Sequence, residues 1–131
     1  MYRDDLKYTK THEWVLLYEN NIARVGVTDF AQQCFGNVLF VELPELDGEH
    51  EQFDSLVIIE AENMLSEVYS PLSGKVITIN EEINHDPTII NHDPYDEGWI
   101  LELEIMNDNE IESLMDYDEY QEFLESGKNE E

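Results

Sequence analysis

The chain has 131 residues, of which 41% are hydrophobic, so it is long enough to form one domain with a hydrophobic core. Only 6 basic residues accompany 32 acidic ones, which gives a formal net charge of −26. This charge repels nucleic acids and anionic membranes, so we expect neither as a partner, and it favours basic partners. It also keeps a protein soluble and monomeric, and both a solubilising role and a specific electrostatic role stay open. We expect a monomer.

Two features of the sequence bear on location and redox chemistry. No segment reaches the ~18 apolar residues that a membrane span needs, and residues 1–14 lack the apolar stretch of a secretion signal. We therefore expect a bacterial cytoplasmic protein, or a mitochondrial one only if a transit peptide has been removed. Cys34 is the single cysteine, which excludes an internal disulfide and a CxxC metal site.

From residue 7 to residue 105 the pattern predicts short β-strands separated by turns. The strands are expected at 13–18, 22–28, 37–43, 55–61, 65–70, 75–80 and 98–105. A short helix is expected between the second and third of these strands, beginning at Thr28 or Asp29 and ending before Gly36. Cys34 falls in the last turn of this helix, where the helix dipole disfavours a thiolate. We therefore interpret Cys34 as a structural thiol.

The unit Asn-His-Asp-Pro occurs twice, at 84–87 and at 91–94. Two histidines and two aspartates at close spacing suggest a metal site. However, Asp-Pro is also ordinary turn and helix-start chemistry, and coordination would need both imidazoles to converge with a further ligand. We interpret both units as structural turns and predict no metal.

The C-terminal part changes character. Residues 1–106 are expected to form the main domain, and 107–125 an acidic amphipathic helix that packs on it. Residues 126–131 are expected to be a disordered tail. The apolar residues at helical spacing are Ile111, Leu114, Met115, Phe123 and Leu124.

Five motifs resemble one known family, the H protein of the glycine cleavage system, over roughly residues 7 to 125. Their order and spacing together carry the resemblance. The motifs are "YTKTHEWV", "VGVTDFAQQCFGNVLFVELPELDG", "VYSPLSGKV", "NHDPYDEGWILELEI" and "LMDYDEYQEFL".

The resemblance implies a mostly β fold, a lipoyl-domain-like barrel-sandwich hybrid of antiparallel sheets. It also implies a short helix after the second strand and a C-terminal helix. Family members are carriers rather than enzymes: lipoate on a lysine at a hairpin tip moves an aminomethyl group between the P, T and L proteins. No Ser-His-Asp arrangement, phosphate-binding glycine loop or HExxH motif argues for catalysis here, and His12 is expected to be structural.

The sequence departs from this family at the attachment position, where the resemblance aligns Asn63 with the lipoyl-lysine. An amide nitrogen is a poor nucleophile because its lone pair is delocalised into the carbonyl, and the side chain is short. Lys75, the nearest lysine, follows "PLSG" in the next strand, so we do not expect it to substitute. We therefore predict no covalent lipoate. Since Asn tolerates the left-handed backbone of tight turns, the fold is expected to survive.

The residues around Asn63 suggest a contact surface for a protein. An apolar spot with an acidic rim is the first interpretation; the second is that Met64 or Leu65 tucks into the edge of the sandwich. The expected contact residues are Glu60, Glu62, Met64, Leu65 and Glu67.

Three functions follow from these observations. The first is a non-lipoylated interaction or regulatory module linked to glycine cleavage or lipoate metabolism, with the P, T or L proteins or lipoate-pathway enzymes as partners. The second is a functional aminomethyl carrier with an unconventional attachment site. The third is a protein that binds a lipoate-like small molecule.

Overall fold

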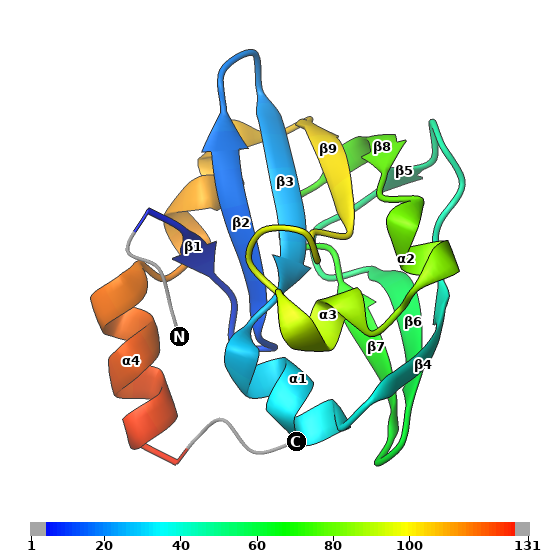
Figure 1. Ribbon diagram of the computed structural model, residues 1–131. Helices are drawn as coiled ribbons and strands as arrows, with labels where there is room; N and C mark the ends of the chain where they lie inside the picture. The colour runs from blue at the N-terminus through cyan, green and yellow to red at the C-terminus, as the bar shows by residue number, and fades with distance from the viewer. Residues whose placement is uncertain (1–4, 128–131) are drawn as a thin grey trace.

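The computed structural model describes residues 5–127, in which the strands form two antiparallel sheets (Figure 1). The larger sheet has six strands in the order β1-β2-β3-β9-β8-β5, and the smaller has three in the order β4-β6-β7. The larger sheet contains β1 (Lys7–Tyr8), β2 (Glu13–Tyr18), β3 (Ile22–Val27), β5 (Glu49–His50), β8 (Gly74–Ile79) and β9 (Leu101–Ile105). The smaller sheet contains β4 (Val38–Glu42), β6 (Ser55–Ala61) and β7 (Leu65–Tyr69).

This architecture confirms the predicted mostly β fold, although the sheets do not close into a barrel. The predicted short helix is α1 (Asp29–Phe35), and Thr28 caps it by accepting a hydrogen bond from the Ala31 amide. It follows the third strand rather than the second because the two-residue β1 precedes the predicted hairpin. Two further short helices, α2 (Glu82–His85) and α3 (Ile89–His92), lie between β8 and β9.

The C-terminal segment differs from the single helix expected over 107–125. It contains a 3-10 helix, η1 (Asp108–Ser113), and a separate helix, α4 (Tyr117–Glu125). Between them the backbone is extended, and Met115 exchanges two backbone hydrogen bonds of 2.8 Å with Tyr8 of β1. Asp116 then starts α4 with a capping box. Most of the expected tail, residues 128–131, lies outside the described residues.

The main hydrophobic core lies between the two sheets. It includes Val25 of β3, Ile59 of β6 and Leu103 of β9, all fully buried. Ile83 of α2 and Ile90 of α3 extend the same cluster. Burial of this size is the main stabilising term of the fold, because each fully buried aliphatic side chain contributes about 1.5–3 kcal/mol.

A second cluster attaches α4 to the larger sheet. The rings of Tyr8 and Tyr120 stack with centroids 4.6 Å apart, and Nδ1 of His12 lies 2.7 Å from the Tyr120 hydroxyl oxygen. His12 is only 3% exposed. His12 is thus buried between α1 and α4, and its structural role stays a prediction.

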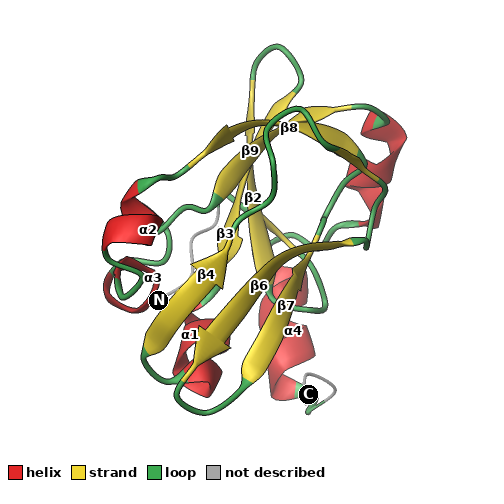
Figure 2. Ribbon diagram, turned by 90° about the vertical axis from the view of Figure 1, so that its right-hand side faces the viewer, coloured by secondary structure: helices red, strands yellow, loops and turns green. Residues whose placement is uncertain are grey.

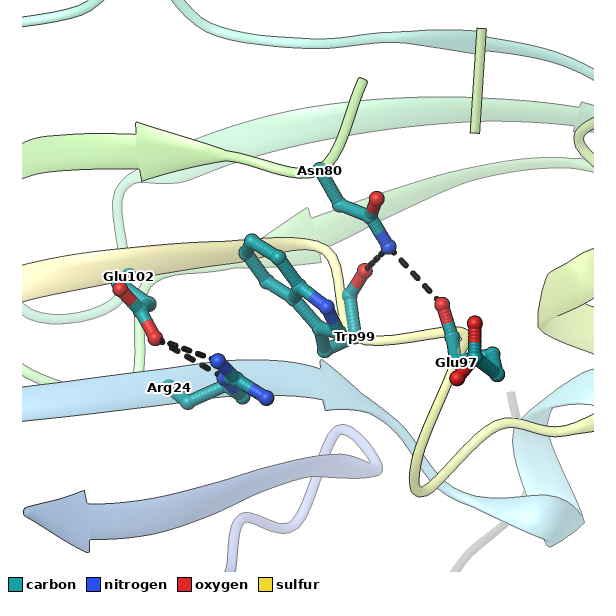
Figure 3. Close-up of polar contacts among 5 residues, drawn as sticks. All are labelled: Arg24, Asn80, Glu97, Trp99 and Glu102. Atoms are coloured by element: carbon teal, nitrogen blue, oxygen red, sulfur yellow. Dashed lines mark hydrogen bonds and ion pairs between the residues drawn. The ribbon is translucent and has the colours of Figure 1, made fainter. Parts of the chain in front are cut away.

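The connection from α3 to β9 is fixed by polar contacts (Figure 3). Nδ2 of Asn80 donates to the carbonyl oxygens of Glu97 (2.9 Å) and Trp99 (2.7 Å). The Arg24 guanidinium pairs with Glu102 at 2.9 Å and lies over the Trp99 ring, 4.4 Å from its centroid. These contacts hold the segment that follows α3, and α3 in turn supports the candidate site. Within residues 5–127 no helix is long and apolar enough to cross a bilayer.

Candidate functional site

The tip of the β6-β7 hairpin lies against the C-terminal end of α1 (Figure 1). The turn is closed by a hydrogen bond from the Ala61 amide to the Met64 carbonyl oxygen (3.0 Å). At the tip, the Glu62 amide donates to the Asn37 carbonyl oxygen and the Asn63 amide donates to the Phe35 carbonyl oxygen, each at 3.0 Å. The tip is therefore attached to α1 by its backbone.

The side chain of Asn63 adds to this attachment. Its Nδ2 donates to the carbonyl oxygen of Cys34, in the last turn of α1, at 3.1 Å. The last carbonyls of a helix have no partner within the helix, so the hairpin tip caps α1. Asn63 does not adopt a positive φ. The reason we gave for its suitability was therefore wrong: this hydrogen bond, rather than tolerance of left-handed backbone, explains the fit of Asn.

Two residues on the other side of this contact make it possible. Gly36 has a φ of 72°, and a Cβ there would lie 2.9 Å from Nδ2 of Asn63. Asn91 of α3 holds the same loop, since its Nδ2 donates to the Gly36 carbonyl oxygen at 2.8 Å and its Oδ1 accepts from the Val38 amide at 2.9 Å. Sequence reasoning missed Asn91. The one feature of the sequence that could have drawn attention to it is its position in the second Asn-His-Asp-Pro unit.

Both Asn-His-Asp-Pro units lie at the ends of short helices. His85 ends α2 and His92 ends α3. Asp86 accepts a hydrogen bond from the Thr88 amide (3.1 Å), and Asp93 accepts one from the Glu97 amide (3.2 Å). These are turn contacts, as we interpreted them. Among the described residues no three potential ligands form a metal-binding group.

The outer face of the three-stranded sheet is not covered by another element (Figure 2). Cross-strand pairing places Phe40, Glu60 and Leu65 in one row and Glu42, Ile58 and Glu67 in the next. Apolar and acidic side chains therefore alternate over this face. Phe40 and Leu65 are 58% and 72% exposed. We call these six residues the β4-β6-β7 face.

The five residues expected to contact a partner separate into two groups. Glu60, Leu65 and Glu67 belong to the exposed β4-β6-β7 face, whereas Oε1 of Glu62 accepts a hydrogen bond from the Asn37 amide at 3.1 Å. Met64 is partly buried and packs on the main core. This is the second interpretation given above, in which one of the two apolar residues tucks into the sandwich. A role of these residues in binding stays a prediction.

A cleft of about 280 Å³ lies beside the hairpin, between β7 and the segment before β2. Glu13, 1% exposed, lines it together with Met64 and Leu65. The Glu13 carboxylate accepts hydrogen bonds from the Thr9 hydroxyl, from the Thr11 hydroxyl (2.6 Å) and from the Tyr69 amide (3.0 Å). Burial raises the pKa of Glu13 to about 7, and the hydrogen bonds oppose that rise. Sequence reasoning did not single out this residue.

Lipoate needs a nucleophilic amine for its attachment, and the residue at the hairpin tip does not provide one. The amide of Asn63 is not nucleophilic and is engaged with the Cys34 carbonyl oxygen. Lys75 lies on β8 in the other sheet, with its Nζ 3.9 Å from a Glu104 carboxylate oxygen. Position 63 therefore does not fit the group.

Two antiparallel sheets that present a hairpin tip beside a cleft define the class of lipoyl-carrier scaffolds. Comparison with known proteins agrees with that class: the family described as "Glycine cleavage H-protein" matches residues 6–127. The chain belongs to this family, whose members are non-catalytic lipoyl carriers.

Individual relatives cover nearly the whole chain. The glycine cleavage system H protein of Staphylococcus epidermidis is 42% identical over 120 residues, which are 92% of this chain and 94% of the relative. That of Symbiobacterium thermophilum is 46% identical over 123 residues, 94% of this chain and 95% of the relative. The crystal structure of a glycine cleavage system H protein from Mycobacterium marinum superposes with a TM-score of 0.82 at 27% identity, covering 92% of this chain and 97% of that one.

Proposed function

We propose that this chain works as the H component of a bacterial glycine cleavage system, in the cytoplasm, in contact with the P, T and L proteins. The observation that carries this proposal is the family match, which extends over residues 6–127. The fold supports it, because the hairpin, the cleft and the helix α1 that borders both are present.

Two forms of this function differ in the fate of lipoate. In the first, the protein is a working aminomethyl carrier. The comparisons support this form better, since the relatives reported above are all named glycine cleavage system H proteins. A carrier of this kind would need an amine other than residue 63. The lysines within residues 5–127 are Lys7, Lys10 and Lys75.

In the second form, the protein is a non-lipoylated interaction or regulatory module. Two observations favour it: the engaged amide of Asn63 and the exposed β4-β6-β7 face. Alternating carboxylates and apolar side chains fit a partner surface that alternates Lys or Arg with apolar groups. Such a module would compete with a lipoylated H protein for the same partner.

The mass of the natively expressed protein separates these two forms. A covalently bound lipoyl group, located by peptide mapping, would establish the carrier and identify its lysine. An unmodified mass, in cells whose other lipoyl proteins are modified, would end the carrier form. A Lys→Arg change at the mapped residue should then remove the modification, and the same change at each other lysine should leave it.

Reconstitution tests the proposal itself. The glycine cleavage reaction is measured with the P, T and L proteins of the same organism. In one mixture this chain replaces the lipoylated H protein, and in another it is added beside that H protein. A carrier sustains turnover alone, and a module inhibits turnover by the lipoylated H protein. If the chain does neither and binds none of the three proteins, a role in glycine cleavage is refuted.

The β4-β6-β7 face can be tested in the same assay. Changing its three carboxylates to Gln should weaken partner binding, and the effect should shrink at high salt because surface charges are screened. A control removes three exposed carboxylates elsewhere. The two triple variants are Glu42→Gln with Glu60→Gln and Glu67→Gln, and Glu19→Gln with Glu81→Gln and Glu122→Gln. Equal effects of both variants would show that only net charge matters.

A third possibility, binding of free lipoate, depends on the cleft beside Glu13, whose volume of about 280 Å³ is close to the lower end of small-molecule sites. Calorimetry with lipoate and lipoamide tests it. Absence of heat at every concentration tried would remove this function.

A further inference from the structure

We propose that this protein has a second binding site, which takes an aliphatic carboxylate of short to medium chain length. The site is an apolar cavity of about 530 Å³ between the turn that precedes β6 and the extended segment that joins η1 to α4. Its volume is typical of small-molecule sites. The cavity adjoins the cleft beside Glu13, with which it shares Lys10, Thr11 and Tyr69, but it has its own apolar walls and does not depend on the proposed function.

The walls of the cavity are largely apolar. Tyr8, Leu114 and Met115 line one side, where the Tyr8–Met115 bridge connects β1 to the C-terminal segment. Tyr69 and Phe53 line it from β7 and from the turn before β6. Since Tyr8 is fully buried and Leu114 is 8% exposed, the floor belongs to the folded core and is not a mobile surface.

Phe53 is the feature that most requires an explanation. Its φ is 73°, a conformation that costs a bulky residue about 1–3 kcal/mol, and its side chain is 60% exposed. The turn is held by hydrogen bonds from the Phe53 amide to the Ser70 carbonyl oxygen (2.7 Å) and from the Asp54 amide to the Glu51 carbonyl oxygen (3.0 Å). The chain itself therefore gains little burial from this side chain, and a molecule in the cavity would cover it.

The charge at the cavity decides the class of ligand. Lys10 is the one charged residue among those that line it, and its side chain is exposed. No carboxylate within residues 5–127 forms an ion pair with Lys10. An apolar wall with one ammonium group at its edge suits an apolar tail that ends in an anion.

The threonine and serine hydroxyls of the cavity are already engaged in hydrogen bonds. The hydroxyls of Thr9 and Thr11 donate to Glu13. Ser113 donates to the Glu110 carbonyl oxygen (2.7 Å) and accepts from Nε2 of Gln52 (2.9 Å). A ligand rich in hydroxyl or amide groups would find few partners, whereas a hydrocarbon chain needs none. Negative charges that lie farther from the cavity than the Debye length, about 8 Å at physiological salt, oppose a bound anion only weakly because salt screens them.

Octanoate is the probe. It is titrated into protein whose intact mass shows that Lys10 is unmodified, at physiological ionic strength and below the critical micelle concentration, with binding followed by calorimetry and by two-dimensional NMR. We expect saturable binding with shifts of the Phe53 and Met115 amide resonances. 1-Octanol and octylamine, with the same chain but no anion, should bind at least about tenfold more weakly, since a hydrogen bond to a charged group contributes about 1.5–3 kcal/mol.

Two variants test the residues. Lys10→Gln should weaken octanoate binding about tenfold and leave octanol binding unchanged. Lys75→Gln is the matched control and should change neither. Phe53→Gly should weaken octanoate and octanol alike while the protein remains folded, because glycine relieves the positive φ.

Several results would overturn the proposal. These are no saturable binding of octanoate, equal binding of octanol or octylamine, or shifts confined to residues outside the cavity. An equal loss of octanoate affinity in Lys10→Gln and Lys75→Gln would mean that octanoate binding depends only on the net charge of the protein. None of these results bears on the native mass or the glycine cleavage assay, so this inference fails independently of the carrier and module forms of the proposed function.

Discussion

The two ends of β6 present opposite kinds of turn. At its C-terminal end, the tip with Asn63 is polar and attached to α1 by hydrogen bonds from both backbone and side chain. At its N-terminal end, the turn with Phe53 exposes a large aromatic side chain on a strained backbone. The first turn is where the resemblance places the family's lipoyl-lysine, yet here the Glu62 amide, the Asn63 amide and Nδ2 of Asn63 all donate hydrogen bonds to residues at the end of α1 or directly after it. In the second turn, burial of the Phe53 side chain does little to offset the cost of the strained backbone.

Family resemblance and energetic cost therefore point to different ends of this strand. Resemblance to a family directs attention to the hairpin tip, where residue 63 is an asparagine without an amine. An exposed apolar residue in a costly conformation directs attention to the other end of the same strand. Each of the predictions below changes one of these two turns or the cleft between them.

The largest effect is expected from Asn63→Lys. This variant places a primary amine on a flexible stem at the tip, so a lipoate–protein ligase supplied with lipoate and ATP should acylate it. The modified fraction at residue 63 should rise from zero in the wild type to nearly one in the variant. Intact mass followed by peptide mapping measures the change. Asn63→Gln, a longer side chain without an amine, is the control and should stay unmodified at this residue. Lipoylation of the unaltered chain at position 63 would contradict the prediction, and so would an inert Lys variant.

The next effect concerns Glu13, in the cleft. Its folded-state pKa of about 7 is above the ordinary value of 4.5, so the folded protein holds the proton more tightly than the unfolded chain does. This stabilisation is fully present below pH 4.5 and is lost as the pH rises to 7, by about 3 kcal/mol. Urea unfolding of wild type and Glu13→Gln between these pH values should therefore show a steeper decline for wild type.

An exposed carboxylate of the same cleft is the control for this pH dependence. Glu67→Gln should leave the slope of unfolding free energy against pH close to that of wild type, because Glu67 is not buried. Parallel curves for wild type and Glu13→Gln would mean that the buried carboxyl does not carry the proton linkage.

A smaller effect separates Phe53 from another exposed phenylalanine. Phe53→Gly relieves a positive φ, which offsets the entropy that glycine adds to the unfolded chain. Phe40→Gly, in β4, relieves no strain, so glycine only lowers the free energy of unfolding, by about 1 kcal/mol. The two side chains are 60% and 58% exposed, so burial does not distinguish them. Chemical denaturation should find the Phe53 variant about 1 kcal/mol more stable than the Phe40 variant. The opposite order would remove the argument from strain.

The smallest effect is expected from Asn63→Ala, which removes the hydrogen bond to the Cys34 carbonyl oxygen. The bond is exposed, so the free energy of unfolding should fall by less than about 1 kcal/mol. Asn84→Ala, on the exposed surface of α2, is the comparison and should not lose stability, since Ala favours helix. Hydrogen exchange at the end of α1 should accelerate in the Asn63 variant alone. Unchanged exchange there would show that the amide does not cap the helix.

Much of the fold was predictable from local patterns. Alternating apolar residues identified β8 and β9, because one face of each strand is buried. The division of residues 107–125 was not predictable, since Leu114 and Met115 also fit helical spacing. Only the pairing of Met115 with Tyr8, more than a hundred residues away, ends η1 there. Glu13 was missed for the same reason, because the amide that completes its site belongs to Tyr69.

The family, the hairpin and the lack of an amine at its tip follow from the amino-acid sequence alone, since they depend on residue identity and short-range order. Three features required the folded chain: the partner of the Asn63 amide, the burial of the Glu13 carboxyl, and the cavity that Phe53, Lys10 and Met115 surround. The physical reason is that hydrogen bonding, desolvation and cavity shape depend on distances between residues that are remote along the chain.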